Sequence, residues 1–331
     1  MPEVLNINQI NIDQWDKLIE NSPTASYFQT KECYDFYCSL SCLKPILYAV
    51  SENGTLVGLV CGYLIADGTV VKRFMSRRAI IPGGVLLSRN ISEEALSLLL
   101  SAVIEELKNR AIYIEFRNYD DFSDYKPVFE KTGFACIPRV NFHIKTDCLE
   151  QVVSNISASK RKNIRNSIKY GSEIIEITDR DEVREFYKII SNLYKKKIKT
   201  PLFDCEFFEK FAGLPNVKFF GIKYQGKIVG GSGCVVLKNK SVYEWFKCGI
   251  DGAYRHIYPS TLATWAGMEF AVKSNVERYD MMGAGKPDER SGIRDFKSKF
   301  GGKLVEHGRF LYVCNSFLYK LGKFYIEKVK I

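Results

Sequence analysis

Two stretches of the sequence resemble each other: YAVSENGTLVGLVCGYLI at residues 48–65 and FGIKYQGKIVGGSGCVVL at residues 220–237. Each joins two apolar runs through a polar residue and a glycine, Asn53-Gly54 in the first and Gln225-Gly226 in the second. A polar residue followed by glycine between two apolar runs is typical of a β-hairpin with a tight turn. Both stretches are therefore predicted to be hairpins of one repeated unit.

The segments that follow the two hairpins also come in the same order: a third apolar strand, a long helix, a strand, a short helix and a final strand. The third strands are expected at VVKRFM from Val70 and SVYEWFKCGI from Ser241. The long helices are expected to begin near Ser92, a good N-cap, and near Pro259, which suits a first helical turn. A repeated order of this kind indicates a duplication.

Helices are also expected before each hairpin, at residues 13–22 and 30–42 in the first copy and at 151–170 and 181–197 in the second. The complete order, β-β-β-α-β-α-β after leading helices, is similar to that of the GNAT acetyltransferase module. The predicted fold class is therefore α/β (α+β), with two tandem GNAT-like (acyl-CoA N-acyltransferase-like) domains. We place domain 1 at residues 1–146 plus 315–331 and domain 2 at 147–314.

The charge and composition of the chain limit the classes of partner and of protein that it fits. The 331 residues carry a net charge of +10, and the segment 151–172 holds five lysines and arginines with no acidic residue. Such a segment favours an anionic partner: a nucleic acid, a phosphorylated donor or an acidic membrane face. No apolar run approaches the ~20 residues that span a bilayer, and the N-terminus lacks a signal-peptide pattern. A cytoplasmic protein is expected, and three scattered histidines with no CxxC pair argue against a metal site.

Four short motifs between Tyr243 and Gly302, namely YEWFKCG, YPSTLATW, YDMMG and GIRDFKSKFGG, resemble the Fem family (FemABX) of non-ribosomal peptidyl transferases. The basic segment KRKNIRNSIKYG resembles the opening of that family's second domain. No segment is long enough for a charged helical hairpin, so the chain resembles the armless branch. The resemblance implies a cleft between two GNAT-like domains and a C-terminal tail that packs on domain 1 through Phe317, Leu321 and Phe324.

The resemblance also implies an activity: transfer of an aminoacyl group from aminoacyl-tRNA to an amine of a peptidoglycan (cell-wall) precursor. Relatives with similar motifs use acyl-CoA, so an N-acyltransferase acting on an amino sugar or surface glycan is the alternative. A non-catalytic protein that binds RNA or anionic lipid is a third hypothesis. The expected partners are tRNA, the cell-wall precursor or amino sugar, and the inner membrane face as a peripheral contact; no bound cofactor is expected.

Lys297 is the first catalytic candidate. In IRDFKSKF, Ile293, Phe296 and Phe300 have the spacing of a buried helical stripe, which would leave Lys297 at its edge. The resemblance implies an essential lysine at this FK position that stabilises negative charge on the substrate or on the tetrahedral intermediate, and it makes Phe296 a substrate-binding candidate. The alternative is a solvated helix lysine, like Lys299.

Asp280 is the second catalytic candidate, because it ends a strand whose carboxyl end is expected to face the site. It could position or deprotonate an amine, or it could only cap the loop that follows. Tyr243, Trp245 and Tyr258 are candidates for the acceptor groove, with buried aromatic packing as the alternative. Lys199, in the basic run YKKKIKT, is a further substrate-binding candidate.

Lys162, Arg165 and Lys169 are predicted to bind tRNA or another anion, because a helical wheel of residues 151–170 places them opposite an apolar side. The segment GAGKPDERSG has the wrong spacing for a phosphate loop and is interpreted as a mobile loop. The glycine-rich turn that holds the pyrophosphate of coenzyme A is missing, which favours aminoacyl-tRNA as the donor. Without a Ser-His-Asp or Cys-His set, direct attack by the acceptor amine is the expected mechanism.

Overall fold

The computed structural model describes residues 1–68, 70–289 and 291–329. The chain divides into two compact units: unit 1 comprises residues 1–139 and 306–331, and unit 2 comprises residues 140–305. Each unit has its own sheet and its own apolar core. The fold is thus mixed α/β with two GNAT-like domains, as the sequence predicts.

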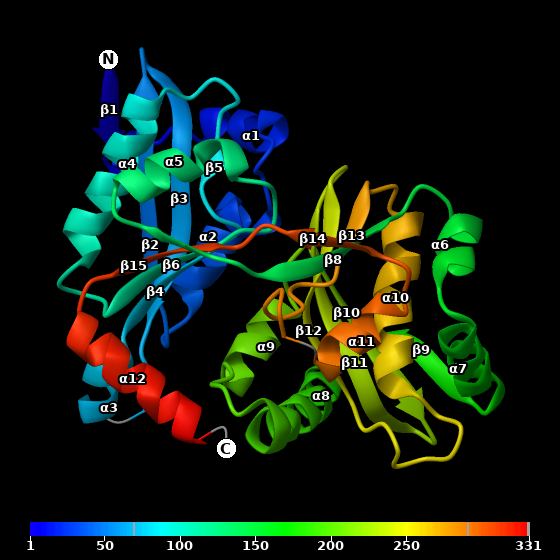
Figure 1. Ribbon diagram of the computed structural model, residues 1–331. Coiled ribbons are helices and arrows are strands. Elements are labelled where there is room, and N and C mark those ends of the chain that lie inside the picture. Colours follow the sequence, from blue (N-terminus) through cyan, green and yellow to red (C-terminus); the bar gives the residue numbers. More distant parts are fainter. Residues whose placement is uncertain (69, 290, 330–331) are drawn as a thin grey trace. The chain divides into compact units, whose positions relative to one another are not determined.

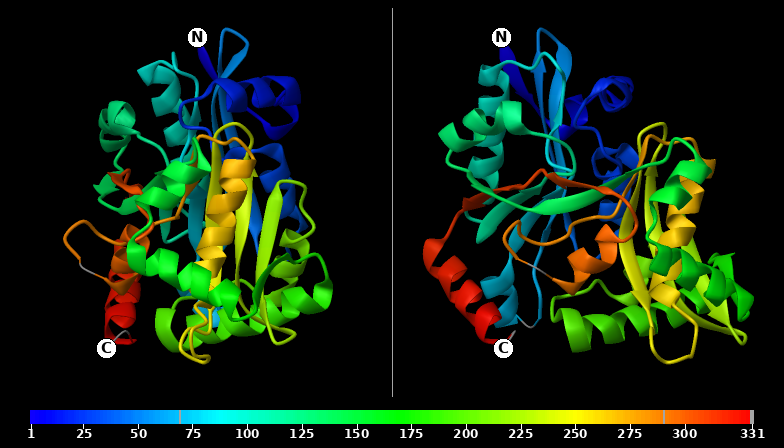
Figure 2. Two further views of the ribbon diagram at one scale, coloured as in Figure 1. Left: turned by 90° about the vertical axis from the view of Figure 1, so that its right-hand side faces the viewer. Right: turned by 45° about the vertical axis from the view of Figure 1, so that its right-hand side comes forward.

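Unit 1 is built on a sheet whose strands lie in the order β1-β2-β3-β4-β6-β15-β7, with β5 paired to β3. In Figures 1 and 2, helix α4 lies on one face of this sheet, and helices α1 and α2 lie on the other. Its strands are β1 (Pro2–Leu5), β2 (Lys44–Glu52), β3 (Thr55–Ile65), β4 (Arg78–Pro82), β5 (Leu86–Leu87), β6 (Tyr113–Arg117), β7 (Ala135–Ile137) and β15 (Arg309–Val313). Its helices are α1 (Ile12–Asn21), α2 (Lys31–Ser39), α3 (Val70–Ser76), α4 (Glu93–Leu107), α5 (Lys126–Lys131) and α12 (Ser316–Val329).

Unit 2 has a sheet in the order β14-β8-β13-β12-β11-β10-β9. Its strands are β8 (Val140–Lys145), β9 (Ser172–Glu176), β10 (Val217–Tyr224), β11 (Lys227–Leu237), β12 (Ser241–Gly249), β13 (Arg278–Asp280) and β14 (Lys303–Glu306). Its helices are α6 (Leu149–Asn155), α7 (Ala158–Lys169), α8 (Arg180–Leu193), α9 (Cys205–Phe211), α10 (Pro259–Lys273) and α11 (Gly292–Ser298), with a π-helix at Tyr194–Ile198.

The glycines of β11 show how two helices approach the sheet of unit 2 from opposite faces. A Cβ on Gly230 would lie 2.8 Å from a side-chain atom of Pro259 in α10, and one on Gly231 would lie 3.1 Å from the ring of Phe186 in α8. Because neighbouring residues of a strand point to opposite faces, α10 and α8 cover different faces. Close packing of these helices therefore depends on the absence of side chains at both positions.

The two hairpins of the repeat form with the turns that the sequence predicts. Asn53-Gly54 has φ values of 51° and 77°, and Gln225-Gly226 has 49° and 75°. Two successive positive φ values are typical of the type I′ turn, which matches the twist of the flanking strands. The predicted long helices also form: Ser92 caps α4 through the backbone N–H of Ala95, and Pro259 opens α10.

The duplicated sheets differ from the prediction in one respect, the origin of a strand. In unit 2, β8 is hydrogen-bonded beside β13, whereas in unit 1 the equivalent place beside β6 is taken by β15, from the end of the chain. The last segment of each copy therefore contributes one strand to each sheet: β7 and β8 come from the first copy, and β14 and β15 from the second. This exchange places the limits of unit 2 at residues 140 and 305, compared with the expected 147 and 314.

Two segments of the predicted secondary structure need correction. VVKRFM, expected as a strand, is helix α3, and the third strand of unit 1 is β4, which begins at Arg78. The helix expected at 151–170 is two helices, because the chain turns at Ile156 and Ser157 between α6 and α7. Arg161 stabilises this break by donating hydrogen bonds to the carbonyls of Val153, Ser154 and Ile156.

The C-terminal tail forms helix α12, which groups with unit 1 and lies beside α3 (Figure 1). The ring of Tyr319 packs edge-to-face on Tyr113 of β6, with 5.6 Å between the ring centroids. The residues expected to be buried by this packing are not: Phe317 is 73% exposed, Leu321 40% and Phe324 56%. Tyr319 lies on the opposite side of the helix, so it is Tyr319 that faces the sheet.

Candidate functional site

A β-bulge in β12 aims two charged side chains at the same helix. Gly233 pairs with Phe246 and Cys234 with Glu244, which leaves Trp245 as the extra residue. Trp245 and Phe246 both pack on the phenylalanines of α9. Glu244 and Lys247, three positions apart, both reach α10 as a result. A bulge changes the alternation of side chains in this way and is common beside functional sites.

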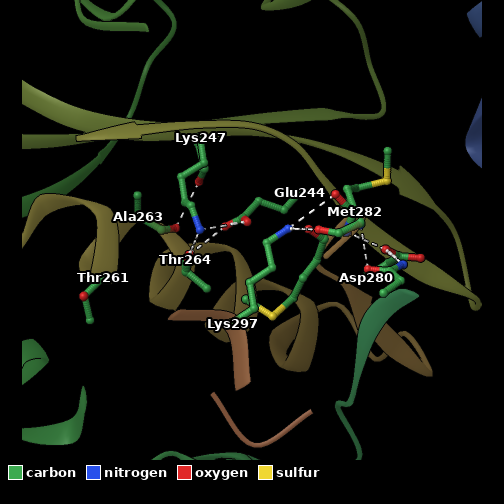
Figure 3. A network of polar contacts seen from close by, with 12 residues as sticks. Glu244, Lys247, Thr261, Ala263, Thr264, Asp280, Met282 and Lys297 are labelled. Atoms are coloured by element: carbon green, nitrogen blue, oxygen red, sulfur yellow. Dashed lines mark hydrogen bonds and ion pairs between the residues drawn. The ribbon is translucent and has the colours of Figure 1, made fainter. Parts of the chain in front are cut away.

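Glu244, Lys247 and Thr264 form a buried polar triangle on the α10 side of the sheet (Figure 3). The Thr264 hydroxyl donates to the Glu244 carboxylate at 2.8 Å, and the Lys247 ammonium lies 3.3 Å from the same carboxylate. Lys247 also donates to Thr264 Oγ1 at 3.1 Å. Glu244 is only 4% exposed, so its charge depends on these partners.

Lys160 is a second buried cation in this region. Its Nζ donates to Thr261 Oγ1 of α10 at 2.8 Å and lies 3.8 Å from the ring centroid of Phe296. The Nζ of Lys247 lies 4.1 Å from the centroid of the same ring. The pKa of Lys160 is lowered to about 8, chiefly by burial; the charge of Asp251 opposes this change, and the positive charges of Lys247 and Lys299 contribute to it. We call Lys160, Lys247 and Phe296 the lysine–phenylalanine cluster.

Lys297 is buried and fully engaged. Its Nζ donates to the backbone carbonyls of Met281, of Met282 at 3.3 Å and of Gly283 at 2.7 Å. Burial lowers the pKa of Lys297 to about 8, with a further contribution from Lys247, while Glu244 and Asp280 act in the opposite direction. An ammonium has three hydrogens, so in this geometry Lys297 holds the turn that follows β13.

The predicted apolar stripe of α11 is therefore wrong in its orientation. Ile293 is 59% exposed, and the buried face carries Lys297 and Phe300, with Phe296 half-buried. Arg294, from the same helix, donates to the carbonyls of Ala284, Lys286 and Pro287. Helix α11 thus presents two cations to the segment 281–287. This contact holds much of the segment that the sequence suggested was a mobile loop.

Asp280 lies in a row of polar side chains on the face of the sheet opposite α10. The register pairs it with Tyr243 of β12 and with His143 of β8, so the three side chains share a face. The Asp280 carboxylate is fully buried, accepts from Asn141 Nδ2 at 2.6 Å and from the Met282 N–H at 2.7 Å, and lies 3.1 Å from His143 Nε2. Burial would raise the pKa of Asp280, but the hydrogen bond and charge of His143, with Arg278, lower it below the usual carboxyl value.

The other predicted substrate residues lie in separate places. Tyr243 is fully buried in the row with Asp280. Trp245 packs against Phe207 and Phe211 of α9. Tyr258 is half-buried at the N-terminus of α10, where its N–H donates to Ser167 Oγ at 3.0 Å. Lys199 is exposed just after the π-helix, in a left-handed backbone conformation with φ 54°.

The three predicted anion-binding residues of α7, Lys162, Arg165 and Lys169, are all exposed. The buried face of α7 differs from the prediction, because it carries Lys160, Ile164 and Ser167 while Ile168 is 52% exposed. Lys160 thus points inward from the same basic segment whose other members point outward.

Sequence reasoning missed four residues of this region: Lys160, Glu244, Lys247 and His143. A signal existed for Lys160, since Ile156, Lys160 and Ile164 follow at four-residue spacing on the apolar side of the predicted helix. No sequence signal marked the bulge that turns Glu244 and Lys247 toward α10.

Two searches of the described residues, which omit 69, 290 and 330–331, gave no hits. One looked for groups of three or more histidine, cysteine, aspartate or glutamate side chains that could hold a metal ion. The other looked for helices long and apolar enough to cross a membrane.

Part of the chain that contains this site resembles a known protein family. A family model described as the FemAB family matches residues 216–327, which include Glu244, Lys247, Asp280, Phe296 and Lys297. A search of curated proteins returned no match.

Three solved structures share the fold. The crystal structure of FemX has a TM-score of 0.72 at 16% identity and covers 96% of this chain and 99% of its own. A tandem GNAT protein from the clavulanic acid biosynthesis pathway has a TM-score of 0.60 at 12% identity, covering 95% and 99%. L-PGS from Bacillus licheniformis has a TM-score of 0.57 at 12% identity, covering 92% of each chain. Residues 216–327 thus resemble the FemAB family, and the chain as a whole shares its fold with FemX.

Proposed function

We propose that this protein transfers an aminoacyl group from aminoacyl-tRNA to an amine of a peptidoglycan precursor, without a bound cofactor. The FemAB family match and the GNAT-like neighbours support a transferase. The observation that carries the proposal furthest is the lysine–phenylalanine cluster within unit 2, in which two ammonium groups lie 3.8 and 4.1 Å from the centroid of one aromatic ring.

The cluster fits an anionic ligand because its charge is only partly balanced inside the protein. Lys247 has Glu244 at 3.3 Å, whereas Lys160 has the neutral hydroxyl of Thr261 as its hydrogen-bond partner among the described residues. A buried ammonium held by one neutral acceptor is energetically unfavourable in the folded state. A phosphate, a carboxylate or a developing oxyanion beside Lys160 would relieve this cost.

The reaction needs a stabilised negative charge and an acceptor for one proton. In aminoacyl-tRNA an ester joins the amino acid to a ribose oxygen. The nitrogen of the acceptor amine bonds to the carbonyl carbon of this ester, and the carbonyl oxygen becomes negative. The bond between that carbon and the ribose oxygen then breaks, and the proton lost by the nitrogen is returned to the leaving oxygen. We assign the negative charge to the Lys160 and Lys247 ammonium groups, and the proton passes from the acceptor nitrogen to the leaving ribose oxygen.

In this scheme, Lys297 and Asp280 have different roles. Lys297 remains the first catalytic candidate of the sequence, and its three carbonyl bonds support a role through its charge and through the turn it holds. Asp280 is fully buried on the opposite face of the sheet, so it would act by holding the Met282 N–H in the turn after β13. The exposed Lys162, Arg165 and Lys169 would contact the phosphates of tRNA.

The proposal is tested by offering the purified protein a pool of aminoacyl-tRNAs and a peptidoglycan precursor with a free side-chain amine. Mass spectrometry of the precursor should show the addition of one amino-acid residue, and ribonuclease treatment of the donor should abolish it. A parallel reaction contains acetyl-CoA and no tRNA. Acetylation in that reaction, with no product from aminoacyl-tRNA, would refute the proposal in favour of an acyl-CoA-dependent N-acyltransferase.

Two variants of α7 connect the activity to the cluster. Lys160→Gln removes the buried ammonium, and Lys162→Gln removes an exposed one two positions away. We expect the first to lose most of the transfer activity and the second to keep most of it. Equal losses in the two variants would separate the activity from the cluster.

A further inference from the structure

Exposed apolar side chains gather on two neighbouring helices of unit 1. On α3, Phe74 is 55% and Met75 42% exposed; on α12, Phe317 is 73% and Leu321 40% exposed. The two helices lie beside each other, as Figure 1 shows. We call these four residues, together with Phe324 at 56%, the α3–α12 surface. Large apolar side chains that cluster on a surface, instead of lying singly, mark an interaction site.

The orientation of α12 turns this apolar face away from the body of unit 1. At 3.6 residues per turn, Phe317, Leu321 and Phe324 lie within about 60° of one another on the helix. Tyr319 lies on the opposite side, and it is Tyr319 that packs on Tyr113 of the sheet. The helix is therefore held through its polar-aromatic side and presents its apolar side outward.

The charges along these two helices are mainly positive, and Glu327, after Phe324, is the one acidic residue in the sequence of either helix. Lys72 and Arg73 on α3 and Lys320 and Lys323 on α12 are exposed. Residues 70–78 and 316–324 contain no aspartate or glutamate. Helices α1, α2 and α5 of unit 1 mix their charges, as α1 does with Asp13, Asp16 and Lys17. Exposed aromatic and aliphatic side chains flanked by lysine and arginine are the pattern of helices that lie in a membrane interface.

We propose that the α3–α12 surface docks on an anionic phospholipid bilayer. Phe74, Phe317 and Leu321 would insert at the boundary between headgroups and acyl chains, while the lysines and arginine contact lipid phosphates. This inference goes beyond the proposed transferase activity and does not rest on it. It gives the peripheral membrane contact expected from the sequence a definite location on the molecule.

Two other occupants fit the charges less well. A second copy of this chain would form a self-complementary contact that brings like charges together. A nucleic acid would pair with the cations but would leave the aliphatic Met75 and Leu321 against a charged backbone. A lipid surface suits both the cations and the apolar side chains, because it offers phosphate and hydrocarbon within a few ångströms of depth.

The experiment is sedimentation of the full chain with vesicles of phosphatidylcholine alone and of equal parts phosphatidylcholine and phosphatidylglycerol. We expect binding to the anionic vesicles at least tenfold stronger, and weaker binding at high salt. The triple variant Phe317→Gln, Leu321→Gln, Phe324→Gln should lose at least tenfold of this affinity. Because all three side chains are exposed, its thermal unfolding should match that of the wild type.

A matched triple variant elsewhere in unit 1 controls for surface hydrophobicity. Ile7→Gln, Ile12→Gln and Leu98→Gln replace residues that are 50%, 54% and 36% exposed, and this protein should bind vesicles like the wild type. The proposal is overturned if the wild type ignores anionic vesicles or if the two triple variants bind alike. It is also overturned if the wild type is a dimer that the α12 variant dissociates, or if the α12 variant loses tRNA affinity and keeps vesicle binding.

Discussion

The long helix of each unit occupies the same place on a similar sheet, but the two helices bury different chemistry. The buried side chains of α4 in unit 1 are all apolar, from Ala95 to Leu107. In unit 2, α10 buries Thr261 and Thr264, which hydrogen-bond to Lys160, Glu244 and Lys247. The long helix of this fold does not need buried polar partners, as α4 demonstrates. The polar groups buried against α10 therefore suggest a function beyond folding.

The largest effect is expected from Lys297→Met, which removes the cation that holds the end of β13. Turnover should fall by ~10²–10³, because the positive charge of Lys297 and the turn that it holds are lost together. The stability of the fold should fall as well. Three backbone carbonyls, of which that of Met281 is buried, lose their donor, and the free energy of unfolding should fall by about 3 kcal/mol.

Urea denaturation and single-turnover rates, both measured where each variant is folded, separate these two effects. The control is Lys299→Met, which replaces an exposed lysine of the same helix. If Lys297→Met loses activity only in proportion to its unfolded fraction, Lys297 holds the turn and has no part in the chemistry.

The next effect concerns the polar row on the other face of the sheet. His143→Gln removes the imidazole beside the Asp280 carboxylate, which holds the turn after β13, and should reduce turnover by about tenfold with little change in substrate affinity. His256→Gln, which replaces a histidine stacked on Tyr170, is the control. A rise in KM without a loss of kcat would show that His143 serves in binding alone.

A smaller effect is expected at the outer face of α7. Replacing Lys162, Arg165 and Lys169 by Gln should weaken tRNA binding by about tenfold at moderate salt and should flatten its salt dependence by about two phosphate contacts. The same change at Lys195, Lys196 and Lys197, which are exposed at the π-helix, should cost less. Binding isotherms over a series of salt concentrations make the comparison, and identical slopes for the two variants would remove α7 from the tRNA site.

Local patterns of the sequence predicted much of the fold. The Asn53-Gly54 and Gln225-Gly226 turns, the Ser92 cap and Pro259 are signals that act within a few residues, and each formed as expected. The exchange of β8 and β15 could not be predicted. Both strands are short apolar segments, and their sequences do not say which sheet edge they join.

The site was less predictable because its contacts are non-local. Lys297 was identified through the family motif, but its three carbonyl partners lie 14 to 16 positions earlier in the chain. Lys160 was hidden in a basic run, where one lysine of several turns inward to meet α10, 101 positions away. Spacing within a helix predicts a face, but it does not predict which partner makes a buried charge acceptable.

The stability of Lys160→Met, measured against that of the wild type as a function of pH, tests the role of the buried ammonium in unit 2. The pKa of Lys160 falls from 10.5 to about 8 on folding, so the folded state binds fewer protons between these values. The contribution of Lys160 to stability therefore rises with pH across that window and is least favourable below pH 8. The stability of the variant should therefore exceed that of the wild type by most at neutral pH, and this difference in stability should shrink as the pH approaches 10.5.

The most direct test of the central claim compares stability and aminoacyl transfer in Lys160→Met at neutral pH. Replacing a buried charge by an apolar side chain of similar length is often neutral or stabilising. If the lysine–phenylalanine cluster serves an anionic substrate, the variant will be at least as stable as the wild type and will transfer at least tenfold more slowly. A variant that is less stable but equally active would show that Lys160 serves the fold, and it would contradict the account.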